Sequence, residues 1–104
     1  MISVAMTTYN GANYVAQQLE SILNQTVPVD EIIIYDDGST DQTAQVIADL
    51  NNPKITYVVN DKNVGYIKNF HQAISKCRGD YIFLSDQDDI WVFNKVERMI
   101  EAMD

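Results

Sequence analysis

The fold class is decided by residues 31–50, which read EIIIYDDGSTDQTAQVIADL. The apolar run at Glu31–Tyr35 predicts a strand that is covered on both faces. An acidic turn follows it, and then Ala44, Ile47 and Leu50, with Val46, recur at helical spacing. A buried strand, a polar turn and an amphipathic helix together form the repeating unit of a parallel α/β sheet.

The same unit is predicted on both sides of this stretch. Three further strands are predicted at the apolar runs Ile2–Met6, Ile55–Val59 and Tyr81–Leu84. Helical spacing follows each run, at Val15, Leu19, Ile22 and Leu23, at Ile67, Phe70, Ile74 and Cys77, and at Phe93, Val96, Ile100 and Met103. This alternation predicts an α/β domain with one parallel sheet, right-handed crossovers and helices on both faces.

Local signals mark two of the helix ends. Ser39 with Gln42 predicts a capping box that opens the second helix, and Gly79 predicts the end of the third. The sequence contains no internal repeat, linker or low-complexity segment. Its 104 residues suit one domain, so residues 1–104 are predicted to form a single unit.

The chain is acidic, with fifteen Asp and Glu residues against seven Lys and Arg residues and a formal net charge of −8. This balance argues against nucleic acid or an anionic membrane surface as a partner, because both are bound by clustered basic residues. An acidic protein that binds a phosphate ester usually needs a divalent cation between the two.

The compartment is indicated by what the sequence lacks. Cys77 is the single cysteine, so an internal disulfide is impossible. No apolar stretch is long enough to span a membrane, and residues 1–6 lack the basic region of a signal peptide. We therefore expect a cytoplasmic protein.

A polar cluster follows each predicted strand. The clusters are Thr7–Gly11, Asp36–Ser39, Asn60–Gly65 and Ser85–Asp89. In an open α/β sheet, ligands bind beyond the carboxyl ends of the strands, where all four clusters would meet. The sequence therefore predicts one ligand site along this edge of the sheet.

The sharpest signal at this edge is Asp86-Gln87-Asp88. Two carboxylates one residue apart, leaving a strand, suit Mg²⁺ or Mn²⁺ when phosphate oxygens complete the coordination shell. The alternative is that these acids form a turn or cap the next helix. An EF-hand is excluded, because Ile90 and Trp91 occupy the positions where that loop needs a ligand and a glycine.

Asp36 and Asp37 are the second signal. A carboxylate at a strand end can accept a hydrogen bond from a base N–H or a ribose hydroxyl, although a simple turn and helix cap is the alternative. With four glycines in all, the chain has neither the G-x-G-x-x-G fingerprint nor a Walker loop. A dinucleotide dehydrogenase and a P-loop ATPase are therefore disfavoured.

Six short segments follow one another along nearly the whole chain. They are Thr8-Tyr9-Asn10, Ser21-Ile22-Leu23-Asn24-Gln25-Thr26, Asp36-Asp37-Gly38-Ser39-Thr40-Asp41, Asn63-x-Gly65, Gly79-Asp80-Tyr81-Ile82 and Asp86-Gln87-Asp88-Asp89-Ile90-Trp91. In this order they resemble family 2 glycosyltransferases of the GT-A class, and the last segment is similar to rhamnosyltransferase-like members. The resemblance implies a Rossmann-like sheet of strand order 3-2-1-4.

The resemblance also implies roles for single residues. Asp37 would contact a pyrimidine base, with Asp36 supporting it and the backbone of Thr8, Tyr9 and Asn10 lining the same pocket. Asp86 would hold the ribose or join the metal shell, and Asp88 would bind the metal that bridges the diphosphate. Three further residues are implied on the donor side: Asn63, Gly65 and, near the place of an arginine in many relatives, Lys68.

The implied reaction is an inverting, metal-dependent transfer with Mn²⁺ or Mg²⁺. A sugar would pass from a UDP- or dTDP-sugar to a glycan or lipid-linked acceptor in bacterial surface polysaccharide synthesis. The family's catalytic base lies in an acceptor-binding half, so the base is expected beyond Asp104 and residues 1–104 are expected to be an N-terminal fragment.

Two expectations follow from a missing half. The fragment should self-associate into a homo-oligomer through its uncovered edge. The full enzyme is expected to associate peripherally with the inner face of the membrane.

Two other functions would use the same acids. A receiver-type signalling module would need a phospho-acceptor after its third strand, where Asp61 stands, and a lysine after a fifth strand that the sequence lacks. A metal-dependent phosphatase or nucleotidyltransferase would use the D-x-D pair. In such hydrolases a nucleophilic D-x-D normally follows the first strand, where Thr7 and Thr8 stand instead.

Overall fold

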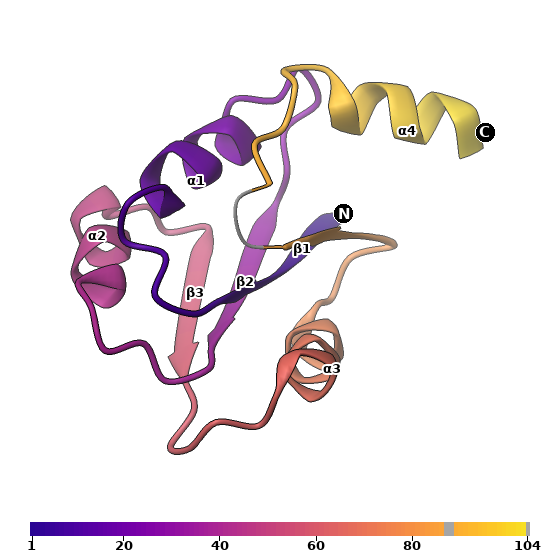
Figure 1. Cartoon of the computed structure of the whole chain (residues 1–104). Helices are drawn as coiled ribbons and strands as arrows, with labels where there is room; N and C mark the ends of the chain where they lie inside the picture. The colour runs from indigo at the N-terminus through magenta and orange to yellow at the C-terminus, as the bar shows by residue number, and fades with distance from the viewer. Residues whose placement is uncertain (87–88, 104) are drawn as a thin grey trace.

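The computed structural model describes residues 1–86 and 89–103. Four strands and four helices alternate along the chain, in the order β1 (Ile2–Thr8), α1 (Val15–Leu23), β2 (Glu31–Asp36), α2 (Thr43–Leu50), β3 (Ile55–Val59), α3 (Tyr66–Lys76), β4 (Tyr81–Ser85) and α4 (Lys95–Met103). The strands form one parallel sheet of order β3-β2-β1-β4 (Figure 1). The predicted fold class and the strand order 3-2-1-4 are confirmed.

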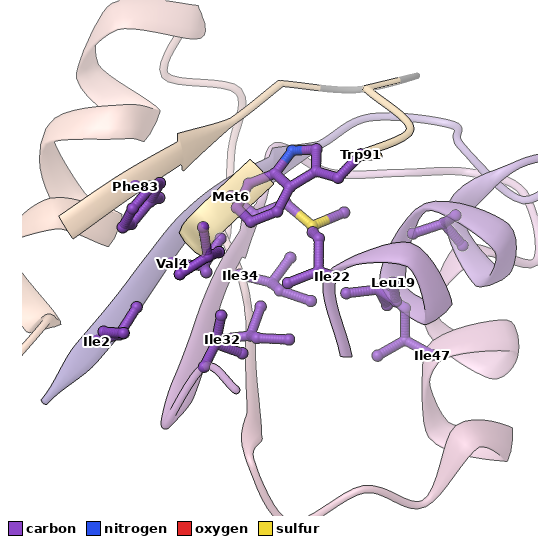
Figure 2. Close-up of a cluster of buried hydrophobic side chains, with 13 residues drawn as sticks. Ile2, Val4, Met6, Leu19, Ile22, Ile32, Ile34, Ile47, Phe83 and Trp91 are labelled. Carbon is purple, nitrogen blue, oxygen red and sulfur yellow. The ribbon is translucent and has the colours of Figure 1, made fainter. Parts of the chain in front are cut away.

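The larger core lies on one face of the sheet. Alternate residues of β1 and β2 face this core, and residues of α1, α2 and α4 pack against them. Figure 2 shows the cluster. Its buried residues are Ile2, Val4, Met6, Val15, Leu19, Ile22, Val29, Ile32, Ile34, Ile47, Phe83, Trp91 and Val96. The other face carries a smaller cluster, in which Ala5, Ile33 and Tyr35 pack against Ala73 of α3. Helices therefore lie on both faces, as the unbroken apolar runs predicted.

The two central strands are buried along their whole length, whereas the edge strands are not. On the α3 face of β4, Ile82 and Leu84 are 41% and 53% exposed. Helix α3 lies over β1 and β2, so this part of the sheet has no helix above it among the described residues. Within the same described part of the chain, no helix is long and apolar enough to cross a membrane.

Two predicted helix faces were wrong in part. Helix α3 buries Asn69, Phe70 and Ala73, whereas Ile67 is 71% exposed. Because α3 sits over β1 and β2, the side of the helix toward β4 stays open, and Ile67 lies on that side with Leu84. Phe93 was predicted on the apolar face of the fourth helix, but it precedes α4 and is 67% exposed. Val96 of the same predicted face is fully buried.

The two predicted helix signals also act differently. Ser39 does not cap α2, because its hydroxyl donates to Asp36; the N–H of Thr43 is instead bound by Asp41, at 3.0 Å. Gly79 does not end α3, which stops at Lys76. A Cβ at position 79 would lie 2.7 Å from the carbonyl oxygen of Met1 and 2.6 Å from Ser3 Oγ, so this glycine permits a close approach to β1.

Candidate functional site

A pocket of about 380 Å³ opens at the carboxyl edge of the sheet. Its lining residues come from the ends of β1, β2 and β4 and from the start of α3; they are Thr7, Thr8, Tyr9, Asp37, Asn63, Gly65, Tyr66, Asn69 and Asp86. Six of them were predicted as site residues from the sequence: Thr8, Tyr9, Asp37, Asn63, Gly65 and Asp86. The polar clusters that follow separate strands therefore meet in one place.

The other predicted site residues lie elsewhere. Asp36 is fully buried behind the pocket, and Asn10 lies in an exposed turn beside it. Lys68 lines a separate hollow on the outer face of α3, together with His71 and Ser75. Asp88 lies outside the residues that the structure describes.

Asp37 fixes the loop that precedes α3. Its Oδ1 accepts a hydrogen bond from the backbone N–H of Val64, at 2.8 Å, and its Oδ2 accepts one from the N–H of Gly65, at 3.1 Å. Gly65 has φ +89°, a conformation that favours glycine. A carboxylate offers about four acceptor positions, so Asp37 keeps acceptor capacity toward the pocket that it lines.

Two amides, the half-buried Asn60 and the buried Asn69, hold Asp37 in turn. Asn60 Nδ2 donates both to Asp37 Oδ1, at 3.1 Å, and to Asn69 Oδ1, at 2.8 Å. Asn69 Nδ2 donates to the backbone oxygen of Tyr35 in β2, at 2.9 Å. This chain of hydrogen bonds connects α3 to the end of β2 and orients the Asp37 carboxylate.

Asp36 is buried and does not line the pocket, but its hydrogen bonds support the edge of the site. Its Oδ2 accepts hydrogen bonds from the hydroxyls of Thr8, Ser39 and Tyr57, and its Oδ1 accepts bonds from two N–H groups of the following turn. Burial acts to raise the pKa of Asp36, but the hydrogen bonds from Ser39, Tyr57 and Thr8 outweigh it and hold the pKa below its ordinary value. The carboxylate therefore stays ionised and locks β1, β2 and β3 together at the edge of the site.

Asn10 joins two of the loops at this edge. It adopts a left-handed conformation with φ +52°, which asparagine tolerates. Its N–H donates to Ser39 Oγ, at 2.8 Å, and its Oδ1 accepts from the N–H of Thr40, at 2.7 Å. These hydrogen bonds therefore connect the turn after β1 to the turn after β2.

Asp86 forms the opposite side of the pocket, at the end of β4. Its side chain is exposed, and the hydroxyl of Tyr66 donates to its Oδ2, at 3.3 Å. The charge of Asp86 raises the pKa of Tyr66 above its ordinary value, and the phenol donates to that carboxylate. Tyr66 closes the pocket between the start of α3 and the end of β4.

The sequence analysis missed three lining residues, Thr7, Tyr66 and Asn69. A signal existed for Asn69, because it shares a helical face with Phe70 and Ala73, and an amide on an apolar face usually has a specific partner. The position of Tyr66 carried no such signal, since its contact with Asp86 joins two separate elements.

Among the described residues, the lining of the pocket is acidic, with two carboxylates and no lysine or arginine. The phosphate groups of a ligand would be repelled by the Asp86 carboxylate, and no basic side chain of the described lining would offset this repulsion. A cation bound between the phosphate and the carboxylate would remove the repulsion. The part of the chain with described coordinates contains no group of three His, Cys, Asp or Glu residues that would hold a metal alone. The exposed carboxylate oxygens of Asp86 nevertheless fit a hard divalent cation whose shell is completed by phosphate.

The family model for "Glycosyl transferase family 2" matches residues 3–104 of this chain. The chain belongs to glycosyl transferase family 2. This membership replaces the two alternatives weighed above. The receiver module is also excluded by topology, because its sheet has the order 2-1-3-4-5 rather than 3-2-1-4.

Two known proteins are similar to this chain over most of its length. The putative colanic acid biosynthesis glycosyl transferase WcaA of Escherichia coli K12 is 39% identical over 98 residues, which cover 92% of this chain and 35% of WcaA. The structure of S. aureus TarS 1–349 in complex with UDP-GlcNAc has a TM-score of 0.83 and 29% identity, and the match covers 98% of this chain and 30% of TarS 1–349.

A third relative was solved with a nucleotide sugar and a metal ion. The mannosyltransferase PcManGT from Pyrobaculum calidifontis, in complex with GDP-Man and Mn²⁺, has a TM-score of 0.78 and 26% identity. The match covers 86% of this chain and 28% of that protein. The present chain thus spans about a third of the length of each of these relatives.

Proposed function

We propose that this chain forms the donor-binding part of an inverting, metal-dependent glycosyltransferase of bacterial surface polysaccharide synthesis. The observation that carries the proposal is the acidic pocket at the carboxyl edge of the sheet. It presents an oriented carboxylate, Asp37, after β2 and an exposed carboxylate, Asp86, after β4, with the end of β1 between them. This arrangement suits a nucleoside at one side and a metal-bound diphosphate at the other.

The nucleoside side is assigned to Asp37 and the end of β1. Asp37 lines the pocket while its other acceptor positions are occupied by Val64, Gly65 and Asn60, so its position is fixed before a ligand arrives. It would accept a hydrogen bond from a base N–H, and the segment Thr8–Asn10 would flank the base. A preorganised acceptor of this kind loses little entropy on binding.

The diphosphate side is assigned to Asp86, with Asp88 as the second carboxylate. Bound Mn²⁺ or Mg²⁺ at these residues would supply Lewis-acid stabilisation of the departing nucleoside diphosphate. Lys68 faces away from the pocket, so it is a weaker candidate for a contact to the diphosphate than the metal. The complexes of TarS with UDP-GlcNAc and of PcManGT with GDP-Man and Mn²⁺ support a nucleotide-sugar donor.

The catalytic base and the acceptor site are assigned to a part of the protein beyond Asp104. The support is that Glu97 and Glu101, the acids of α4, do not line the pocket. A general base must lie within hydrogen-bond reach of the acceptor hydroxyl. Residues 1–104 would then form one domain that binds the donor but does not activate the acceptor.

Titration calorimetry with UDP, dTDP and GDP, each with and without Mn²⁺, tests this function. We expect UDP or dTDP to bind more tightly when Mn²⁺ is present. Asp88→Asn should abolish this gain, because one carboxylate charge is lost from the metal site. Asp61→Asn, which removes an exposed acid that does not line the pocket, is the matched control. Unchanged Mn²⁺-dependent binding in Asp88→Asn would contradict the metal assignment.

The sugar of the donor is a finer proposal. The segment Ser85–Trp91 is similar to rhamnosyltransferase-like members, so dTDP-rhamnose belongs in the donor panel beside UDP-glucose and UDP-GlcNAc. Tighter binding of dTDP-rhamnose than of the UDP-sugars would support the subgroup. Tighter binding of the UDP-sugars would contradict the rhamnosyltransferase-like subgroup and would not affect the proposed glycosyltransferase function.

A further inference from the structure

One family segment, Ser21–Thr26, has no part in the pocket described above. It begins in the last turn of α1 and continues just past the end of that helix. Two of its side chains, Ser21 in α1 and Gln25 just past its end, together with Gln18 one turn earlier, contact the same later stretch of the chain. We call Gln18, Ser21 and Gln25 the polar stripe of α1.

The polar stripe binds the chain on both sides of the acidic segment that follows β4. On the first side, Gln18 Nε2 donates to Ser85 Oγ, at 3.0 Å, and to the backbone oxygen of Asp86. On the second side, Ser21 Oγ accepts a hydrogen bond from the N–H of Trp91, at 3.0 Å.

Gln25 completes the second side with two bonds. Its Nε2 donates to the backbone oxygen of Val92, at 2.7 Å, and its Oε1 accepts from the N–H of Val96, at 3.0 Å. The second of these bonds satisfies an N–H in the first turn of α4, which has no partner within its own helix. A backbone bond from Thr26 to the oxygen of Phe93, at 2.9 Å, lies beside them.

These contacts differ from ordinary core packing. Gln18 and Gln25 are buried amides, and burial of an amide is unfavourable unless it is hydrogen-bonded. Both polar atoms of Gln25 and the Nε2 of Gln18 have such bonds, whereas Gln18 Oε1 has no hydrogen-bond partner among the described residues. Their partners are almost all backbone groups. The stripe therefore holds the backbone on either side of the acidic segment, and this effect does not depend on the side chains of that segment. It leaves the side chain of Asp86 directed to the pocket and to Tyr66.

We propose that Gln18, Ser21 and Gln25 are positioning residues that set the Asp86 carboxylate for the metal-dependent part of donor binding. The inference rests on the donor-binding function proposed above. Among the described residues, the hydrogen bonds given for the stripe do not reach the Asp37 side of the pocket, whose bonds come from Asn60, Asn69 and the loop before α3. The two sides of the site are therefore held by separate hydrogen-bond networks.

The test compares Ser21→Ala, which removes the acceptor for Trp91, with Ser21→Thr, which keeps a hydroxyl. Gln25→Leu is the second variant, and Gln45→Leu on the exposed face of α2 is its matched control. For each protein, UDP affinity is measured by calorimetry with and without Mn²⁺, and the apparent Mn²⁺ affinity is measured by titration. The fluorescence of Trp91, the single tryptophan, reports the position of the segment independently of ligand.

We expect Ser21→Ala and Gln25→Leu to lower the Mn²⁺-dependent gain in UDP affinity at least tenfold and to shift the Trp91 emission. UDP affinity without Mn²⁺ should stay within about twofold of wild type. Ser21→Thr should recover most of the gain, and Gln45→Leu should change neither affinity.

Two outcomes overturn the inference in different ways. If both affinities fall together, in proportion to a lower melting temperature, or if neither changes, the stripe is structural only and the donor-binding function stands. If wild-type protein itself shows no gain with Mn²⁺, the metal-dependent function fails and the positioning role fails with it.

Discussion

At the residue scale, the two adjacent acids at the end of β2, Asp36 and Asp37, have opposite surroundings. Asp36 is enclosed by donors from two strands, β1 and β3, and one turn, whereas Asp37 lines the pocket. The sequence reading had placed both in the donor site, with Asp36 in support. Their separation follows from strand geometry, because consecutive residues at a strand end point to opposite sides.

Asp36→Asn should destabilise the fold by about 3 kcal/mol at pH 7, because a buried carboxylate with several charge-assisted hydrogen bonds is replaced by an amide that cannot accept all of them. The folded pKa is depressed, so the stabilisation by Asp36 is complete above the unfolded pKa of about 3.9 and is lost as the pH falls through the folded pKa. Urea unfolding between pH 7 and pH 2 measures both effects.

The variant should also lose less stability than wild type over the acid range. Asp49→Asn, on the exposed face of α2, is the control and should follow the wild-type curve. Parallel curves for wild type and Asp36→Asn would show that this carboxylate is not a source of the acid sensitivity.

Asp37→Ala should weaken UDP binding about tenfold even without metal, which corresponds to about 1.4 kcal/mol. The physical reason is the loss of the acceptor for the base and of the anchor for Val64 and Gly65. Calorimetry without Mn²⁺ measures the change. A loss seen only with Mn²⁺ present would assign Asp37 to the metal side of the pocket.

At the element scale, the strands were readable because burial on both faces leaves a continuous apolar run. Helix faces were harder to predict. The spacing of Ile67, Phe70 and Ile74 gave a helix, but periodicity does not say which strands that helix will cover. Since α3 lies over β1 and β2, Phe70 is buried and Ile67 is exposed.

The pocket was predictable in outline for a similar reason. Residues at strand ends meet at one edge of any parallel sheet, so Thr8, Asp37 and Asp86 were found from their position alone. The network through Asn60 and Asn69 was not, because its bonds join α3 to β2 and depend on how closely the two elements approach.

Gly79→Ala tests the approach of the connection between α3 and β4 to the start of β1. The added Cβ would meet the Met1 backbone oxygen at 2.7 Å and the Ser3 N at 2.8 Å, so the connection must shift. We expect a loss of about 2 kcal/mol in the free energy of unfolding. Ser75→Ala on the exposed face of α3 is the control, with an expected change within about 0.5 kcal/mol.

Both variants can be followed by the same denaturant titration. A Gly79→Ala protein as stable as wild type would mean that the connection has room to move, and that the glycine is there for another reason.

At the scale of the whole molecule, both edges of the sheet stand open among the described strands, and the β4 edge also carries exposed apolar side chains. β4 pairs with β1 alone, and Ile82 and Leu84 are exposed beside it. Open edges and apolar patches favour pairing between chains. We expect residues 1–104, expressed alone, to self-associate at concentrations of about 100 µM and above.

Sedimentation velocity over a range of concentrations measures this association. Leu84→Lys should shift the population toward monomer, because a charge on an edge strand opposes pairing. Ala44→Lys, at an exposed position of α2, should not. A clean monomer for the unmodified chain at the highest concentration would contradict the prediction.

The polar stripe has a consequence for how the molecule assembles in time. Gln18 and Gln25 bind partners 67 to 71 positions later in the chain, and β1 pairs with β4 across a similar separation. Contacts between such distant parts of a chain form slowly, because a long loop must close before they contribute any free energy. The segment 85–96 should therefore join last, after β1, β2 and β3 have paired. During that interval the surface of α1 that receives the segment is open to solvent, and a folding chain at this stage would already have its Asp37 side built while the Asp86 side was still unformed.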